Sequence, residues 1–247
     1  TYSSVGEFAN AGKIQEVPEN VYTTEEMQNL FYEGATANKL VNGKYYAVPD
    51  EINVESPSLY VNMTKLKDLG VELPASWEEL VEFAKSLTVR DEAGNITQAG
   101  LSYCYAQWES MLESLIWQFG GDFRDEANKT VHFQTEEAKK AVEFMLHYEG
   151  TGEDALCAGN NSRYDEFAEG TAVMCVGAPW YAGGFSTDIP DTEYQVFNMP
   201  AYVDGAEPTS LATGGWAYIV SSRCDEATSA AAWEFVKFMT SADEVGE

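Results

Sequence analysis

The sequence is short of cationic residues, and this shortage excludes two broad classes of partner. Lysine and arginine number 14 among 247 residues, against 41 aspartates and glutamates, so the formal net charge is −27. Such a surface repels phosphate backbones and anionic lipid headgroups, so we expect no binding to nucleic acid or to a membrane surface. We attribute the acidity mainly to solubility, with a cationic ligand as the alternative.

Long apolar runs are also missing from the sequence. No run approaches the roughly 20 apolar residues that span a bilayer. No signal peptide stands at the start, so we expect a mature or trimmed chain. Apolar residues make up 45% and charged residues 22% of the composition, a balance typical of soluble globular proteins. The length allows one large domain or two modest ones.

Cysteine and histidine are too scarce for a disulfide framework or a zinc site. The four cysteines form no C-x-x-C pair, and only two histidines are present. Cys104 and Cys175 fall inside apolar strand-like runs and are interpreted as buried thiols, with one bridge between them as the alternative. His132, in a predicted hairpin, and His147, in the last turn of a predicted helix, are interpreted as structural.

The motifs of common enzyme classes are absent as well. There is no G-x-S-x-G elbow, phosphate-binding loop, dinucleotide fingerprint or H-E-x-x-H pair. The acidic stretch 90–95 lacks the ligand spacing of a calcium loop and is interpreted as a solvated turn. The sequence therefore predicts a protein that is not an enzyme and has no catalytic residue, metal site or cofactor.

Amphipathic helices alternate with short strand-like runs along the chain. Helices are predicted after Ser76, which forms a capping box with Glu79, after Thr135, over about residues 109–119, and from about residue 225. The last helix is predicted to bury one apolar face, formed by Ala232, Phe235, Val236 and Met239.

The strand-like runs indicate the fold class. Strands are predicted over residues 45–49, 59–62, 100–104, 172–176, 194–197 and 216–220, and Asn42-Gly43 predicts a tight turn before the first of them. Strands separated by helices favour an α/β fold with mixed sheets. Neither an internal repeat nor a flexible linker divides the sequence.

Aromatic residues stand at the ends of predicted elements, two groups of them after a strand and Trp216 at the start of one, and loops at strand ends bind ligands in layered α/β proteins. The residues of interest in these loops are Tyr105, Gln107, Trp108, Trp180, Tyr181, Gly215 and Trp216. Indole faces match the apolar C–H faces of pyranose rings, so we predict that these residues contact a neutral sugar. Core packing is the alternative, and we adopt it for Trp77, Trp117 and Trp233, which lie on amphipathic helices.

Seven segments follow one another in an order known from a protein family. They are residues 8–13 (FANAGK), 42–49 (NGKYYAVP), 59–62 (LYVN), 74–80 (PASWEEL), 120–122 (GGD), 167–174 (FAEGTAVM) and 178–180 (APW). Together they cover nearly the whole chain. In this order they resemble the extracellular solute-binding proteins of sugar ABC importers, the group that includes maltose-binding protein.

The resemblance implies a two-lobed α/β fold whose lobes are joined by crossover strands and close on a sugar between them. It assigns residues 1–55 to part of the first lobe, 56–205 to the second lobe, and 206–247 to a return to the first. The family's first strand–helix–strand unit and its carboxy-terminal helices have no counterpart in this sequence, so we expect a fold that is partial at both ends.

The resemblance also points to binding residues. The family's ligand contacts follow the strand that ends at Pro49, and the aromatic residue after Ala178-Pro179 is its stacking position, here Trp180. The positions that the resemblance adds are Ser3, Ser4, Asp50, Glu51 and Asn53. The two serines stand where charged residues would reach the ligand, and this departure argues against simple maltodextrin specificity.

The sequence thus predicts a monomeric carbohydrate-binding receptor that delivers a sugar or oligosaccharide to ABC permease subunits. It would act outside the cell, as a membrane-anchored lipoprotein or in a periplasm. One alternative keeps the fold and changes the cargo to a polyamine, a metal complex or a peptide. The other is a glycoside hydrolase, which needs two carboxyl groups about 5–9.5 Å apart, and no sequence pattern nominates such a pair.

Overall fold

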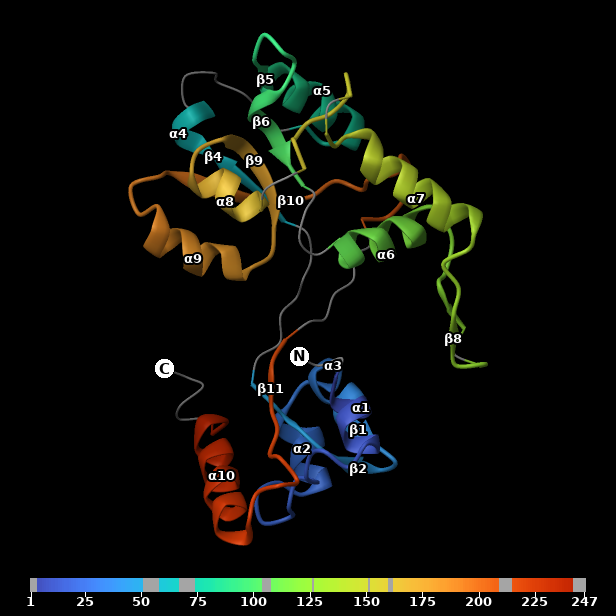
Figure 1. Ribbon diagram of the computed structural model, residues 1–247, viewed down its shortest axis with the longest axis vertical. Coiled ribbons are helices and arrows are strands. Elements are labelled where there is room, and N and C mark those ends of the chain that lie inside the picture. Colours follow the sequence, from blue (N-terminus) through green and yellow to red (C-terminus); the bar gives the residue numbers. More distant parts are fainter. Residues whose placement is uncertain are drawn as a thin grey trace. The chain divides into compact units, whose positions relative to one another are not determined.

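The computed structural model describes residues 4–50, 58–66, 74–103, 108–125, 127–150, 152–159, 162–208 and 215–241, with the backbone alone for residues 108–110. Contacts between residues divide the chain into two compact units (Figure 1). Unit 1 consists of residues 1–54 and 212–247, and unit 2 of residues 55–211. The lobe boundaries inferred from the resemblance stay a prediction.

Unit 2 is built on a mixed five-stranded sheet with the strand order β10-β4-β9-β6-β5. The strands are β4 (Ser58–Asn62), β5 (Val89–Arg90), β6 (Ile96–Ser102), β9 (Ala172–Gly177) and β10 (Tyr194–Asn198). Strands β6 and β9 run parallel, while β4 is antiparallel to both β9 and β10. All six residues of β9 are buried, as expected for a central strand that is covered on both faces.

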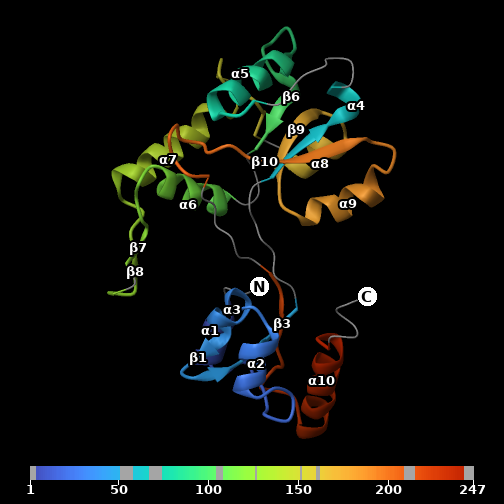
Figure 2. The same cartoon turned by 180° about the vertical axis from the view of Figure 1, so that it is seen from behind.

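Alternating side chains of the central strands enter two different helix layers of unit 2. Leu59 and Val61 of β4 join the core formed with α5 (Trp77–Leu87), α6 (Trp108–Gln118) and α7 (Glu136–His147). Tyr60, between them, packs instead against α8 (Arg163–Ala168) and α9 (Trp180–Asp188). Successive strand side chains point to opposite faces, so the sheet lies between two layers of helices, as Figures 1 and 2 show from opposite sides.

The remaining elements of unit 2 are short. Helix α4 (Met63–Leu66) follows β4, and a hairpin of β7 (Arg124–Asp125) and β8 (Thr130–Val131) connects α6 to α7 and projects away from them (Figure 1). Phe123, at the base of this hairpin, stacks on Trp117, with ring centroids 5.6 Å apart.

Unit 1 contains two separate two-stranded sheets. β1 (Leu40–Val41) pairs with β2 (Lys44–Tyr45), and β3 (Val48–Pro49) pairs with β11 (Ala217–Tyr218), both antiparallel. The helices are α1 (Val5–Asn10), α2 (Thr24–Leu30), α3 (Glu33–Thr36), the 3₁₀ turn η2 (Ala37–Lys39) and α10 (Glu226–Met239). Their buried residues form two small clusters, one around Met27 and Trp233 and the other around Val5 and Ile14.

Most predicted elements are confirmed, with three corrections. The predicted strand 45–49 is divided between β2 and β3, because its first part pairs with β1 and its last part pairs with β11. The predicted strand 216–220 is reduced to Ala217–Tyr218. The apolar face predicted for the last helix is wrong at Phe235, which is 56% exposed, because α10 is turned so that Trp233 and Val236 face the core.

The predicted helix ends are confirmed by their hydrogen bonds. Ser76, Thr135 and Asp225 each cap a helix by accepting a backbone N–H from the residue three positions later. The Glu79 carboxylate accepts from the Ala75 N–H at 3.3 Å, one residue before the expected partner. After α6, the Gly121 N–H donates to the Ile116 carbonyl at 2.9 Å, the pattern of a Schellman ending.

The structure tests the core packing predicted for the helix tryptophans and the buried thiol predicted for Cys175. Trp77 and Trp233 are buried as predicted, and Trp117 is half-buried against the main core. Cys175 is a buried free thiol, whereas Cys104 lies outside the described residues. The stretch 90–95 is an exposed turn closed by Asp91, whose carboxylate accepts the N–H groups of Ala93 and Asn95.

Candidate ligand-binding site

Trp180 is the exposed aromatic residue at the start of α9. It follows β9 through Ala178 and Pro179, and Pro179 is the N-cap of the helix. Its side chain is 45% exposed although the neighbouring Ala178 and Tyr181 are buried. The structure therefore places the indole at the surface of unit 2, at the end of a central strand, where the sequence predicts it.

Tyr181 does not share this exposure, and its predicted contact with ligand is corrected. The residue is 2% exposed, and its ring packs between Tyr60 and Phe185. Its hydroxyl accepts a hydrogen bond from Arg163 Nε at 3.0 Å. Because the ring is enclosed in the core, it supports the surface aromatic residue and offers no face to a ligand.

The buried guanidinium of Arg163 connects Tyr181 to Tyr103, which follows β6. Arg163 is buried at the start of α8, and its Nη1 donates to the Tyr103 carbonyl at 3.1 Å. Burial raises the pKa of Tyr181, and the charge of Arg163 opposes that rise. The guanidinium thus joins α8, the end of the β6 segment and α9 through hydrogen bonds in the interior.

Tyr164 is a component of this surface that sequence reasoning missed. Its ring stacks on Trp180, with centroids 6.2 Å apart and planes 22° apart. Its hydroxyl donates to Asp188 Oδ2 at 2.5 Å, and burial, followed by this bond, raises the pKa of Tyr164 to about 12. The short helix α8 carries too few residues for periodicity to assign a direction to its side chains.

Unit 1 presents a second exposed indole beside a carboxylate. Trp216, preceded by Gly215, lies next to β11 and is 58% exposed. Its carbonyl accepts the Asp50 N–H at 3.0 Å, which extends the pairing of β11 with β3. The Tyr218 hydroxyl donates to the Asp50 carboxylate, and this bond is the main cause of the raised pKa of Tyr218. An indole, a phenol and a carboxylate are therefore held together by one two-stranded ribbon, which is formed by β3 and β11.

Tyr218 was missed, although a signal for it exists. It stands two residues after Trp216 in a predicted strand, and residues at this spacing point to the same face. The ribbon thus joins three of the predicted contacts, Asp50, Gly215 and Trp216, and adds Tyr218 to them.

Several predicted contacts cannot be placed in this way. Ser3, Glu51, Asn53, Tyr105 and Gln107 lie outside the described residues, and Trp108 is described only as the first residue of α6. Ser4 is half-buried at the start of α1 and makes no side-chain cap bond. Ligand contacts by these residues stay predictions.

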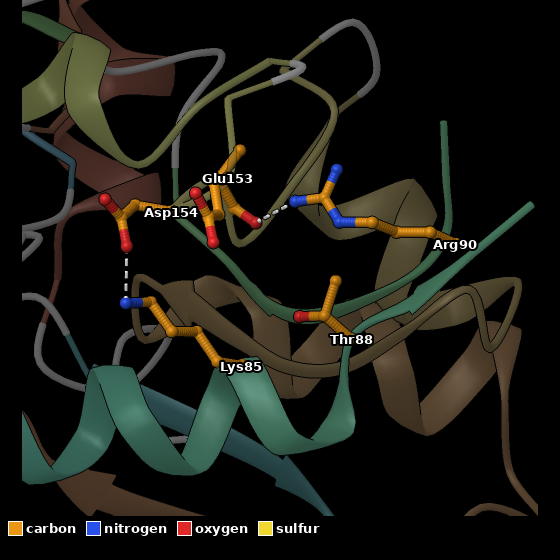
Figure 3. Close-up of a pocket in the computed structure, with 6 residues that line it drawn as sticks. Lys85, Thr88, Arg90, Glu153 and Asp154 are labelled. Atoms are coloured by element: carbon orange, nitrogen blue, oxygen red, sulfur yellow. Dashed lines mark hydrogen bonds and ion pairs between the residues drawn. The ribbon is translucent and has the colours of Figure 1, made fainter. Parts of the chain in front are cut away.

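A hollow of about 260 Å³ on unit 2 is lined by Lys85, Thr88, Arg90, Glu153, Asp154 and Ala155 (Figure 3). Its cations bind within the chain: Lys85 Nζ lies 2.6 Å from Asp154 Oδ1, and Arg90 Nη2 donates to the carbonyls of Gly152 and Ala155. The hollow is smaller than the roughly 300–1,000 Å³ of ligand pockets. We interpret it as a junction that fastens residues 152–155 to α5 and β5.

Other kinds of site find no support among the residues that the structure describes. Within that part of the chain, no group of three or more histidine, cysteine, aspartate or glutamate side chains is arranged to hold a metal ion. A search of the same residues finds no helix with the length and apolar character needed to cross a membrane.

Comparison with known proteins identifies the family. The model of the family described as bacterial extracellular solute-binding protein matches residues 2–245. The chain therefore belongs to the bacterial extracellular solute-binding proteins, and the resemblance found in the sequence is confirmed.

Two curated relatives each share 25% identity with this chain over the matched residues. The chain is 25% identical over 213 residues to the multiple sugar-binding protein of Streptococcus mutans, which covers 82% of this chain and 49% of that protein. It is also 25% identical over 243 residues to the maltotriose-binding protein of Pyrococcus abyssi, covering 98% and 49% of the two chains. The chain thus spans about half the length of these relatives.

Solved structures confirm the fold. The maltose/maltodextrin-binding domain of Bdellovibrio bacteriovorus, bound to maltotriose, matches with a TM-score of 0.80 and 23% identity, over 98% of this chain and 61% of that one. A maltose-bound MalE3 of T. maritima matches with a TM-score of 0.75 and 22% identity, over 97% and 60%. The predicted two-lobed α/β fold is confirmed, and it is partial relative to these proteins.

Proposed function

We propose that this chain is the ligand-binding body of an extracellular receptor that captures a sugar or oligosaccharide and delivers it to an ABC importer. Membership of the solute-binding family supports the receptor class. Two relatives named for binding sugars support the cargo. In this proposal the receptor is a monomer without enzyme activity, in a periplasm or held outside the cell by a lipid anchor.

The exposed indole of Trp180 is the observation that carries the sugar assignment. Its position on a rigid helix start leaves an apolar aromatic surface open to solvent, and such a surface suits the C–H face of a pyranose ring. In unit 1 the Trp216 indole with the Asp50 carboxylate supplies an apolar face and a hydroxyl acceptor side by side. A neutral polyol needs both kinds of contact.

A cationic cargo such as a polyamine is the second candidate. The net charge of −27 favours it, because an anionic surface raises the local concentration of cations. Electrostatic attraction of this kind weakens with added salt, whereas stacking on indole rings does not depend on it.

A thermal-shift panel distinguishes the two candidates. The panel contains mono-, di- and trisaccharides, including maltose and maltotriose, together with spermidine, each at low and at high salt. A ligand that binds only the folded state raises the melting temperature, so we expect a salt-insensitive shift with at least one sugar. A shift with spermidine alone would overturn the sugar assignment. Release of reducing ends from the bound sugar would overturn the non-enzymatic assignment.

A further inference from the structure

Tyr164 of α8 lies along one face of α9. Its ring stacks on Trp180 at the start of α9, and its hydroxyl donates to Asp188 at the end of that helix. Trp180, Gly184 and Asp188 are spaced by four residues, so they share one face of the helix. Tyr164 therefore contacts the first and the last residue of a stripe of three positions on α9.

The stripe admits the ring because its middle residue has no side chain. A Cβ atom at Gly184 would lie 2.3 Å from the Tyr164 hydroxyl oxygen and 2.9 Å from its Cζ. At the neighbouring Gly183, a Cβ atom would meet nothing within 4 Å. Close approach of Tyr164 thus requires glycine at position 184 and not at position 183.

Two more aromatic residues of α9 hold the Tyr164 ring. Phe185 stacks on Tyr164 with ring centroids 4.6 Å apart and planes 17° apart, and Phe185 is fully buried against Phe167. Tyr181 contacts Tyr164 edge to face at 5.1 Å. A ring held by stacking, by an edge contact and by a hydrogen bond has little freedom to rotate.

Among the residues that the structure describes, the rings of Tyr164 and Tyr181 contact the Trp180 indole. Tyr164 lies in an offset stack beside one face of the indole, and Tyr181 meets the indole at a centroid distance of 4.4 Å and an angle of 69°. The indole nevertheless remains 45% exposed. The exposed part is therefore the side that these two tyrosines do not cover.

We infer that Tyr164 is a positioning residue that fixes the Trp180 indole, so that a sugar ring stacks on the opposite indole face alone. This inference rests on the proposed function, because it specifies how the candidate sugar meets Trp180. Tyr164 would act through Trp180, without touching the ligand, and Gly184 would be the residue that makes the arrangement possible.

Paired glycine substitutions test the inference. Gly184→Ala and Gly183→Ala remove the same helix-propensity penalty of glycine in one helix, but only the first displaces Tyr164. The near-ultraviolet circular dichroism of Trp180, taken as the difference between each protein and its Trp180→Phe counterpart, reports the stack without ligand. The dissociation constant for maltotriose, from titration calorimetry, reports the consequence for binding.

We expect Gly184→Ala to lose most of the Trp180 dichroism and to bind maltotriose about fivefold more weakly, while Gly183→Ala matches the parent protein in both. Tyr164→Phe, which keeps the ring, should retain the dichroism, and Tyr164→Ala should lose it. An unchanged dissociation constant in Gly184→Ala would overturn the inference, whether or not the dichroism changes. If the parent protein binds no sugar, the proposed function fails, and retained dichroism in Gly184→Ala would separately overturn the support of Trp180 by Tyr164.

Discussion

The two units differ in the size of the sheet and of the core that carry their candidate contacts. Unit 2 places Trp180 at the end of a five-stranded sheet that carries buried side chains on both faces. Unit 1 places Trp216 beside a ribbon whose strands have two residues each, above a core divided into two small clusters. Trp180 is stacked on Tyr164, whereas Trp216 is the more exposed of the two indoles.

This difference bears on how each indole would contribute to binding. Stacking and burial fix an aromatic ring before the ligand arrives, so less conformational entropy is lost on binding. An indole with greater exposure has more rotamers to lose. We therefore expect unit 2 to supply the rigid contact and unit 1 the weaker one.

The largest effects should come from the cores themselves. Leu101 of β6 and Met27 of α2 are both fully buried, and truncation of such residues to alanine costs about 2–5 kcal/mol. We expect Leu101→Ala to lie near the upper end of this range and Met27→Ala near the lower end, because a small cluster collapses more easily around a cavity. Denaturant unfolding measures both. Equal losses would show that the two units are packed equally well.

The next effect is on affinity. Trp180→Ala should weaken sugar binding at least tenfold, which corresponds to about 1.4 kcal/mol, and Trp216→Ala should weaken it about threefold, both measured by calorimetry. Phe238→Ala is a matched control, since Phe238 is 54% exposed on α10, which carries none of the candidate contacts. A larger loss in Trp216→Ala than in Trp180→Ala would reverse the comparison.

Removal of a helix cap should change stability less, and the two units should differ in how this change depends on pH. Ser76→Ala in unit 2 should cost about 1 kcal/mol at every pH, because its hydroxyl does not titrate. In unit 1, the Thr228 N–H lowers the pKa of the capping Asp225. The Asp225 contribution is complete above the unfolded pKa of about 3.9 and is lost as the pH falls through the folded pKa. Melting temperatures of Ser76→Ala and Asp225→Asn between pH 2 and 7 should show a pH-dependent difference from the parent only for Asp225→Asn.

These helix boundaries are also the part of the fold that was predictable from the sequence. Ser76, Thr135 and Asp225 act on amide groups three residues away, so the information is local. The division of the strand at 45–49 depends on the change of partner from β1 to β11, and the exposure of Phe235 depends on how α10 is turned against the rest of unit 1. Neither follows from the residues of the element alone.

The residues of the candidate site also differ in whether local sequence information is enough to predict them. Trp180 was predictable because a strand ends just before it, and Tyr218 could have been added from its two-residue spacing to Trp216. Tyr164 could not, because its partners Trp180 and Asp188 are distant in sequence and meet it only when α8 and α9 pack together. The burial of Tyr181 has the same origin, since the sheet and α8 enclose its ring.

The smallest expected effect concerns a buried carboxyl group of α8. Glu166 of α8 is buried, its Oε2 has no hydrogen-bond partner, and burial raises its pKa, against a lowering by the Ser102 hydroxyl. The folded state therefore binds the proton more tightly than the unfolded state, and this group favours folding increasingly as the pH falls from its folded pKa to the unfolded value of about 4.3.

Glu166→Gln removes this dependence, so its melting temperature relative to the parent should be highest near pH 8 and should decrease toward pH 4.5. The slope is diagnostic, because an unpaired amide nitrogen in the variant shifts stability equally at all pH values. Glu92→Gln, in the exposed turn, controls for the loss of one charge, and an equal slope in that control would show that Glu166 is not specifically perturbed.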